Sequence, residues 1–297
     1  MAGGFDAGEA LRGGLGDRRQ AWEFIRRFAA EWTAPLAPGD GVSRDAWRAA
    51  EQRIGAELPT ALREAYLLFG RRPDSTARQD RLVRPHELSL DESGTTVVFR
   101  VENQRCAAWG VPVSDLGRAD PPVYVQDRDG GWERFLDRVS VACVEMVLSE
   151  VVLGRGSSGD MCELPAGLIA VVESAYEQMA VPEYRLWADR SITVRWFSAP
   201  GKLLRMDGRG PRCWLLVGGR PWPIWNPSAR PSPGPGPAFS GPAGNPGNPR
   251  HVAGLNVIRP SQEPDTWARA RIDILRAIRG PSCTIAGRAE SAEWSIL

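Results

Sequence analysis

Few residues in the chain have the types and spacing that chemistry requires, and most of them lie in VENQRCAAWGV, residues 101–111. Glu102, Asn103, Gln104 and Cys106 stand there together at the end of an apolar, β-branched run, and His86 lies a short way upstream. A cysteine, a histidine base and an orienting amide form the set of a thiol hydrolase. The same polar residues can instead close a strand end or contact a partner.

The surroundings of Cys106 decide between these readings. A catalytic cysteine commonly sits at a helix N-terminus that favours the thiolate, whereas Cys106 follows an extended run and leads into AAWGV without a helix start. The second histidine, His251, lies in a Pro/Gly-rich tail, so His86 alone would have to act as the base. We therefore predict no catalytic residue and no enzyme activity, and we keep a thiol hydrolase as a third hypothesis.

The other motifs that suggest a ligand have simpler explanations. GRGSSG at 154–159 matches a dinucleotide-binding pattern, but no helix opens within it, so we expect a loop. DRDGG at 127–131 stops short of a calcium loop and is typical of a hairpin turn. The five cysteines are odd in number and form no C-x-x-C pair. We expect no metal and no cofactor.

Composition narrows the class of partner. The 297 residues include 37 basic and 36 acidic ones, and residues 43–219 carry 23 basic against 25 acidic, so there is no basic stripe for DNA or RNA. No run approaches the roughly 20 apolar residues that span a bilayer, and the N-terminus has no signal-peptide core. We expect a cytoplasmic protein with no direct nucleic-acid or membrane partner.

The first seventy residues have helical periodicity. DRRQAWEFIRRFAAEW begins with a suitable cap at Asp17, Ser43 can cap a second helix that Gly55 stops, and LPTALREAYLLFG begins at Pro59. Whether the first of these helices packs on the rest of the chain stays open. The later run VSVACVEMVLSEVVL is too long for a strand and predicts a buried helix. LPAGLIAVVESAYEQM repeats the Pro-started helix pattern, with Leu168, Val171, Val172 and Tyr176 at helical spacing.

Extended patterns begin at Thr95. TTVVFRV and PPVYVQ predict strands, and ITVRWFS, GKLLRM and RCWLLVGG within 192–219 predict a three-stranded meander. Helices and strands are segregated, which favours an α+β fold with a mainly antiparallel sheet flanked by helices. We predict an N-terminal helical extension at 1–42, the α+β domain at 43–220, a disordered Pro/Gly-rich linker at 221–263, and a short amphipathic helix with a tail at 264–297.

The order of these motifs resembles the SUKH superfamily, the Smi/Knr-type domain. LPTALREAYLLFG, RLVRPHEL, VVFRVENQ, WGV and DPPVYV with a Trp soon after carry the resemblance over residues 43–220, and WF…APGKLLRMDG…CWLLVGGR is similar to the closing meander of long bacterial members. The most specific pieces are VENQ and DPPVY. The tail departs from the pattern, because a Pro/Gly segment stands where a further helix is expected.

The resemblance implies a non-enzymatic α+β binding domain. Bacterial members are largely immunity proteins that neutralise toxin domains, often nucleases or deaminases, and fungal relatives are similar to regulators of cell-wall synthesis and signalling. We therefore expect an immunity protein whose partner is a toxin domain, with an intracellular regulator or scaffold as the alternative. The residues expected to contact the partner, or to hold the shape of the sheet edge, are Glu102, Asn103, Gln104, Trp109, Asp120, Tyr124 and Trp132.

Overall fold

The computed structural model describes residues 5–126, 130–153, 160–210 and 213–219. All of these belong to one compact unit, residues 1–221. Over these described residues the fold is α+β with two antiparallel sheets of six strands each, so the predicted fold class is confirmed. The sequence did not indicate that the strands divide between two sheets. The segments predicted as a loop at 154–159, a linker at 221–263 and a helix with a tail at 264–297 lie outside the described residues.

The predicted N-terminal helices form where the capping residues place them. Helix α2 (Arg18–Trp32) begins after Asp17, whose side chain accepts a hydrogen bond from the Gln20 amide. Helix α3 (Arg44–Ile54) runs from the Ser43 cap to Gly55, which ends it at φ 78°. The other helices are α1 (Ala7–Leu11), α4 (Thr60–Phe69, after Pro59), α5 (Pro73–Thr76), α6 (Val139–Leu153) and α7 (Ala166–Ala175), with 3₁₀ turns η1 (Pro85–Glu87) and η2 (Val113–Asp115).

The first sheet has the strand order β1-β3-β4-β5-β6, and β2 also pairs with β3. Its β5–β6 hairpin is the one predicted from DRDGG, and residues 130–131 of that turn are described. The β3–β4 pairing shifts its register between Val98 and Arg100. The strands are β1 (Asp80–Leu82), β2 (Ser89–Leu90), β3 (Thr96–Glu102), β4 (Ala108–Pro112), β5 (Val123–Gln126) and β6 (Trp132–Leu136).

The second sheet has the order β7-β12-β11-β10-β8, and β9 also pairs with β10. The predicted meander of 192–219 is confirmed as β10, β11 and β12. The sequence did not predict the three short strands that complete the sheet. The strands are β7 (Asp160–Leu164), β8 (Glu177–Gln178), β9 (Tyr184–Leu186), β10 (Asp189–Ala199), β11 (Lys202–Asp207) and β12 (Cys213–Gly219).

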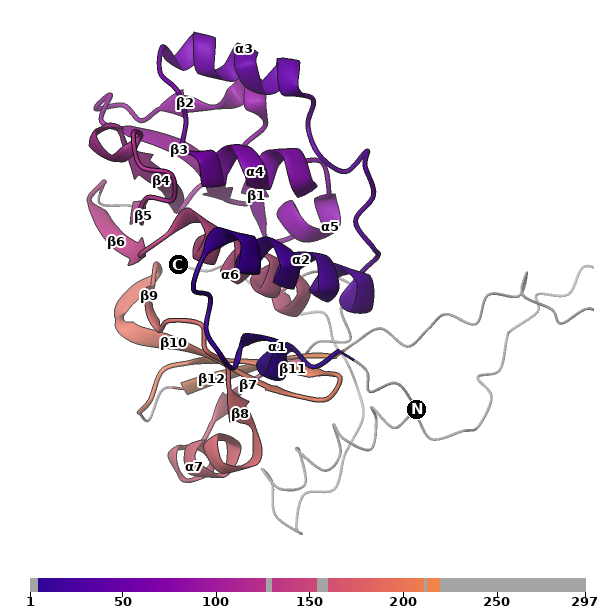
Figure 1. Ribbon diagram of the computed structural model, residues 1–297. Helices are drawn as coiled ribbons and strands as arrows, with labels where there is room; N and C mark the ends of the chain where they lie inside the picture. Colours follow the sequence, from indigo (N-terminus) through magenta and orange to yellow (C-terminus); the bar gives the residue numbers. More distant parts are fainter. Residues whose placement is uncertain (1–4, 127–129, 154–159, 211–212, 220–297) are drawn as a thin grey trace, which may run out of the picture. The chain divides into compact units, whose positions relative to one another are not determined.

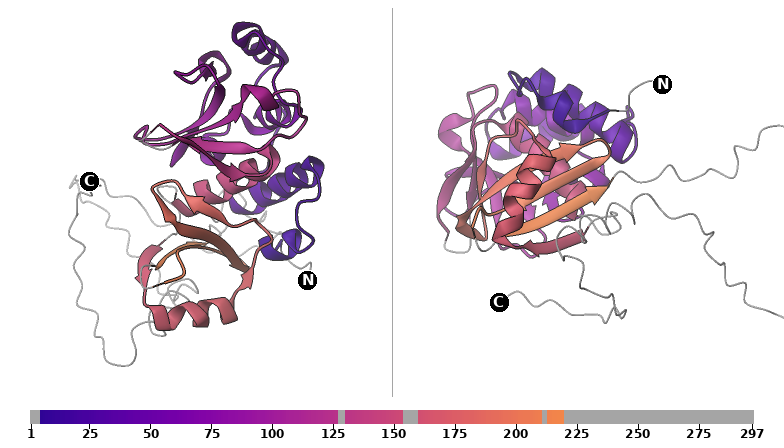
Figure 2. Two further views of the ribbon diagram at one scale, coloured as in Figure 1. Left: turned by 90° about the vertical axis from the view of Figure 1, so that its left-hand side faces the viewer. Right: turned by 90° about the horizontal axis from the view of Figure 1, so that it is seen from below.

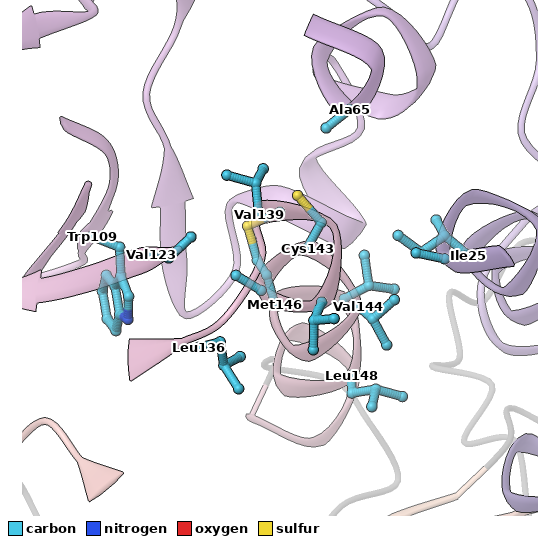
Figure 3. Packing of buried hydrophobic residues seen from close by; sticks show 14 of the residues in the cluster. Ile25, Ala65, Trp109, Val123, Leu136, Val139, Cys143, Val144, Met146 and Leu148 are labelled. Carbon is cyan, nitrogen blue, oxygen red and sulfur yellow. The ribbon is translucent and has the colours of Figure 1, made fainter. Parts of the chain in front are cut away.

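Helix α6 lies between the two sheets (Figure 1). Every one of its residues except Leu153 is buried, which confirms the predicted buried helix. In Figure 3 its apolar side chains point in all directions, toward Ile25 of α2, Ala65 of α4 and Leu136 of β6. One hydrophobic core therefore contains residues from both sheets and from α6.

The N-terminal segment is part of this core. Trp22, Ile25, Phe28 and Trp32 of α2 are buried, and α2 packs against α6. Figure 2 shows α2 beside α6 in the left view. This answers the question that the sequence left open, because residues 17–32 pack on the domain.

Helix α7 differs from its prediction in extent and in face. It ends at Ala175, and the next strand, β8, takes Glu177 and Gln178 instead of a last helical turn. Ile169 and Val172 are its buried residues, while Val171, another residue of the predicted apolar pattern, is 46% exposed. Figure 1 shows α7 on the side of the second sheet away from α6.

Candidate functional site

The first sheet has one face in the core and one outer face. Val97, Trp109, Val111, Val123 and Val125 point into the core and are buried. Figure 1 shows α4, α5 and α6 gathered on that side of the sheet. The alternate residues of the same strands form the outer face and are half-buried: Val98, Val101, Ala108, Tyr124, Gln126 and Trp132.

Trp132 is fixed on this outer face by two contacts. Its indole Nε1–H donates to Asp91 Oδ2 at 3.0 Å, and Asp91 also accepts from the amides of Thr95 and Thr96, each at 2.9 Å. A Cβ on Gly110 would approach the Trp132 ring to 3.1 Å and the Thr96 methyl to 2.4 Å, so the indole uses the space that glycine leaves. Trp132 is therefore held in a set position on the outer face.

The β3–β4 turn stands at the edge of the outer face and contains most of the VENQ motif. Glu102 is buried, and its carboxylate accepts from the amides of Gln104 at 2.7 Å and Cys106 at 3.2 Å. Glu102 therefore closes the strand end, which was the structural alternative for this residue. Asn103 and Gln104 are exposed at the tip of the turn, where a partner can reach them.

Arg105, in the same turn, has φ 60° and is the one non-glycine residue with positive φ in the described part of the chain. The left-handed conformation costs a residue with a Cβ about 1 kcal/mol or more, and glycine would avoid that cost. Strain of this kind concentrates at functional positions. Sequence reasoning did not select Arg105, because no local pattern distinguishes it from the other arginines.

A groove of about 340 Å³ crosses the outer face beside this turn. Its floor includes Val98, Val101 and Ala108, and Arg105 stands at one side. Arg81 and Glu87 also line the groove and form an ion pair, with side chains 38% and 41% exposed. The groove thus combines an apolar floor with a charged rim, the arrangement found in protein-binding surfaces.

Two of the predicted contact residues lie elsewhere. Trp109 is 2% exposed on the core face of β4, so it cannot touch a partner, and this prediction was wrong for a physical reason: the alternation of β4 points residue 109 inward. Asp120 accepts from the amide of Ser140 at 2.9 Å and from its hydroxyl at 2.6 Å. It therefore holds the first turn of α6. Of the seven residues predicted, Asn103, Gln104, Tyr124 and Trp132 remain accessible on the outer face or its turn.

A buried network of charged side chains joins the core side of this sheet to the second sheet. Glu145 of α6 accepts from Arg100 of β3 at 2.7 Å, from the hydroxyl of Tyr184 in β9 at 2.8 Å and from Ser149 at 2.6 Å. Arg100 also donates to Asp80 of β1, and its guanidinium lies 4.3 Å from the centre of the Trp109 ring. The Trp109 ring therefore forms a cation–π contact with Arg100 inside the protein.

The remaining acidic groups of this region also have defined partners. Glu150 accepts from the backbone amides of Gln79 and Asp80, and Arg205 of β11 binds Asp207 at 2.7 Å. Asp80, Arg100, Glu145 and Arg205 are among the residues that line a cavity of about 50 Å³, which is much smaller than ligand pockets. The sequence signal for this network is the presence of Glu145 and Glu150 inside an otherwise apolar helix and of Arg100 inside an apolar strand.

The pKa values in the network depend on burial and pairing. Burial opposes the ionised form of Glu145, but the charge and hydrogen bonds of Arg100 outweigh it, so the pKa of Glu145 is below its ordinary value. Burial dominates for Asp80 and Glu150, and the pKa of each carboxyl is raised. Arg100 stays protonated because its two acidic neighbours raise the pKa of its guanidinium against the effect of burial. Through these paired charges and hydrogen bonds, the network links β1 and β3 of the first sheet to α6 and to β9 of the second sheet.

The residues considered for thiol chemistry lie in a turn and in a short 3₁₀ helix. Cys106 is in the β3–β4 turn, where its amide donates to Glu102, and His86 is exposed on η1. Cys143 is buried in α6, and burial raises the pKa of its thiol. Within the described ranges, no group of three or more His, Cys, Asp or Glu side chains could hold a metal ion. None of the described helices combines the length and apolarity that a membrane crossing requires.

Comparisons of the chain with protein-family models, with curated proteins and with solved structures found no match.

Proposed function

We propose that the chain is a non-enzymatic protein-binding domain, and specifically an immunity protein that binds a toxin domain and occludes its active site. The observation that carries this proposal is the outer face of the first sheet, where Tyr124 and Trp132 lie half-exposed among valines while the opposite face fills the core. Aromatic side chains held in set positions at low entropic cost are typical of binding hot spots.

The conformation of Arg105 in the β3–β4 turn also supports the outer face as the binding surface. Arg105 adopts the left-handed conformation and lies on the rim of the groove, although glycine would meet the backbone requirement at lower cost. A contact between this guanidinium and a partner carboxylate would account for an arginine at this position. The resemblance to the SUKH superfamily supplies the class of partner, a toxin domain with nuclease or deaminase activity.

Co-expression with a toxin domain, taken from a neighbouring gene where one encodes it, tests the proposal. The wild-type chain should protect cells and co-purify with the toxin, and Tyr124→Ala with Arg105→Glu should lose both properties while remaining folded. Trp214→Ala with Arg118→Glu is the matched control, because Trp214 is 39% exposed on the second sheet and Arg118 is an exposed arginine on another loop. Protection that survives the outer-face changes would place the binding surface elsewhere.

Deleting residues 221–297 separates the immunity function from the regulator or scaffold alternative. Protection through the outer face should survive the deletion, whereas recruitment through the tail should not. If the wild-type chain neither protects cells nor binds the toxin, the immunity function is wrong.

A further inference from the structure

Helix α4 is apolar on two sides, which is unusual for a helix at a protein surface. Ala61, Leu62, Ala65, Tyr66 and Phe69 are buried in the core. On the other side, Leu67 and Leu68 are half-buried and line an open groove between α4 and α2. The core therefore accounts for only part of the apolar surface of this helix.

The groove has a volume of about 620 Å³, larger than the groove on the outer face. Its floor is formed by Leu67, Leu68 and the edge of Trp22, and three arginines of α2 stand along it: Arg18, Arg19 and Arg26. Residues 19, 22 and 26 of α2 are spaced at i, i+3 and i+7, so they form one stripe along the helix. The stripe alternates cation, aromatic ring and cation.

The acidic side chains that line this groove are already engaged. Asp17 caps α2 through the amide of Gln20. Glu64 accepts from Arg18 Nε and from the indole Nε1–H of Trp22, both at 2.8 Å. Arg19 and Arg26 are exposed and form no ion pair within the described part of the chain. The charge left for a partner is therefore positive, and it lies along the α2 side of the apolar floor.

We propose that the groove between α2 and α4 is a second docking surface, which takes an acidic amphipathic helix from another protein. Such a helix would place leucine-like side chains on Leu67, Leu68 and Trp22 and carboxylates beside Arg19 and Arg26. This surface is formed by helices, and the outer face of the first sheet does not contribute to it. The inference stands whether or not the immunity function holds.

Charge also argues against the chain's own C-terminal segment as the occupant. Residues 220–297 contain nine basic and five acidic residues, and the amphipathic stretch expected there carries Arg269, Arg271, Arg276 and Arg279. Like charges facing each other across a groove oppose binding. An acidic segment of a different protein fits the groove better.

The test uses the full-length protein and two fluorescein-labelled synthetic peptides of about 14 residues, roughly four helical turns. One peptide carries leucine on one face and glutamate on the other, and the second has lysine in place of every glutamate. Binding is measured by fluorescence anisotropy. The acidic peptide should bind at least about tenfold more tightly, and its affinity should fall severalfold when NaCl is raised from about 0.05 M to about 0.3 M.

Variants locate the binding. Arg19→Glu with Arg26→Glu should weaken acidic-peptide binding by about tenfold, and Leu67→Gln with Leu68→Gln should weaken it similarly. Arg44→Glu, which changes an exposed arginine on α3, is the control and should leave affinity within about twofold. Circular dichroism confirms folding of each variant.

Three results would overturn the inference. Equal affinity for the two peptides would remove the electrostatic argument. Unchanged binding in the Arg19→Glu, Arg26→Glu protein would place the site elsewhere. A severalfold gain in affinity on deletion of residues 221–297 would identify the tail as the occupant of the groove.

Discussion

At the scale of single residues, the outer face depends on positions that look unremarkable in the sequence. Asp91 was not selected as a functional residue, yet it receives four hydrogen bonds, from Ser93, Thr95, Thr96 and Trp132. Alternation along a strand predicts which residues share a face, but it does not predict which loop carboxylate will reach an indole on another strand. Trp132 could therefore be predicted from the sequence, and its orientation could not.

Replacing Arg105 by glycine should stabilise the fold and weaken partner binding. Relief of the left-handed strain gains about 1 to 2 kcal/mol, and the greater freedom of glycine in the unfolded chain takes back about 0.5 to 1 kcal/mol. Urea unfolding should show a net gain of about 0.5 to 1 kcal/mol. A destabilised Arg105→Gly protein would instead assign the arginine a role in the fold.

Asp91 should make stability depend on acid pH. Burial raises the pKa of Asp91, but its hydrogen bonds outweigh burial, so the folded-state pKa is below the ordinary value. A lowered pKa stabilises the fold above the unfolded value, about pH 3.9, and this contribution disappears as pH falls through the folded value. Asp91→Asn should therefore cost about 1 kcal/mol at neutral pH, and the difference from wild type should shrink below about pH 3.9.

Urea unfolding at several pH values measures this difference. Asp137→Asn, which changes an exposed carboxylate, should alter stability by less than about 0.5 kcal/mol. A difference for Asp91→Asn that stays constant down to the lowest pH would contradict the assignment.

At the scale of elements, cap residues predicted where helices begin and end, and the long apolar run predicted the buried helix α6. The short strands could not be predicted from the sequence. Asp17, Ser43 and Gly55 set helix ends through contacts within a few residues, so local sequence contains that information. Strand β8 has two residues, and its pairing with Phe197 and Ser198 depends on the chain returning from far along the sequence. Glu145 and Glu150 stand in the apolar run of α6, and a local pattern does not identify the partners that they bind.

Removing the cation at the centre of the network should destabilise the protein strongly. Arg100→Met leaves Asp80 and Glu145 facing each other without a positive charge, at a cost of about 3 to 5 kcal/mol at neutral pH. Adding Glu145→Gln to Arg100→Met should recover part of this loss, because one of the uncompensated charges is then absent. Urea unfolding of the two single variants and the double variant measures the coupling.

An exposed ion pair provides the control for this cycle. Arg48→Met breaks the contact with Asp45 on α3, where both side chains are more than two-thirds exposed, and should cost less than about 0.5 kcal/mol. If Arg100→Met is as mild as Arg48→Met, the buried network does not hold the layers together.

At the scale of the whole molecule, the sequence predicted one sheet where the structure has two. Periodicity shows that a segment is extended, but it does not show which sheet the strand joins, because that depends on helix α6 offering apolar side chains in every direction. A helix buried all round can serve two sheets at once. The apolar composition of α6 indicated that the helix is buried. Only the structure shows that residues of both sheets cover it.

Because one core contains residues of both sheets, the two sheets should unfold together. Leu136→Ala in β6 and Leu203→Ala in β11 remove matched buried side chains, 2% and 0% exposed, and each should cost about 2 to 5 kcal/mol. Each variant should shift a single urea transition that far-UV circular dichroism and tryptophan fluorescence report at the same midpoint. If the sheets were independent, each variant would move only one of two transitions, and the midpoints from the two probes would separate. Coincident midpoints in both variants would mean that the two sheets, which share the core around α6, unfold as one unit.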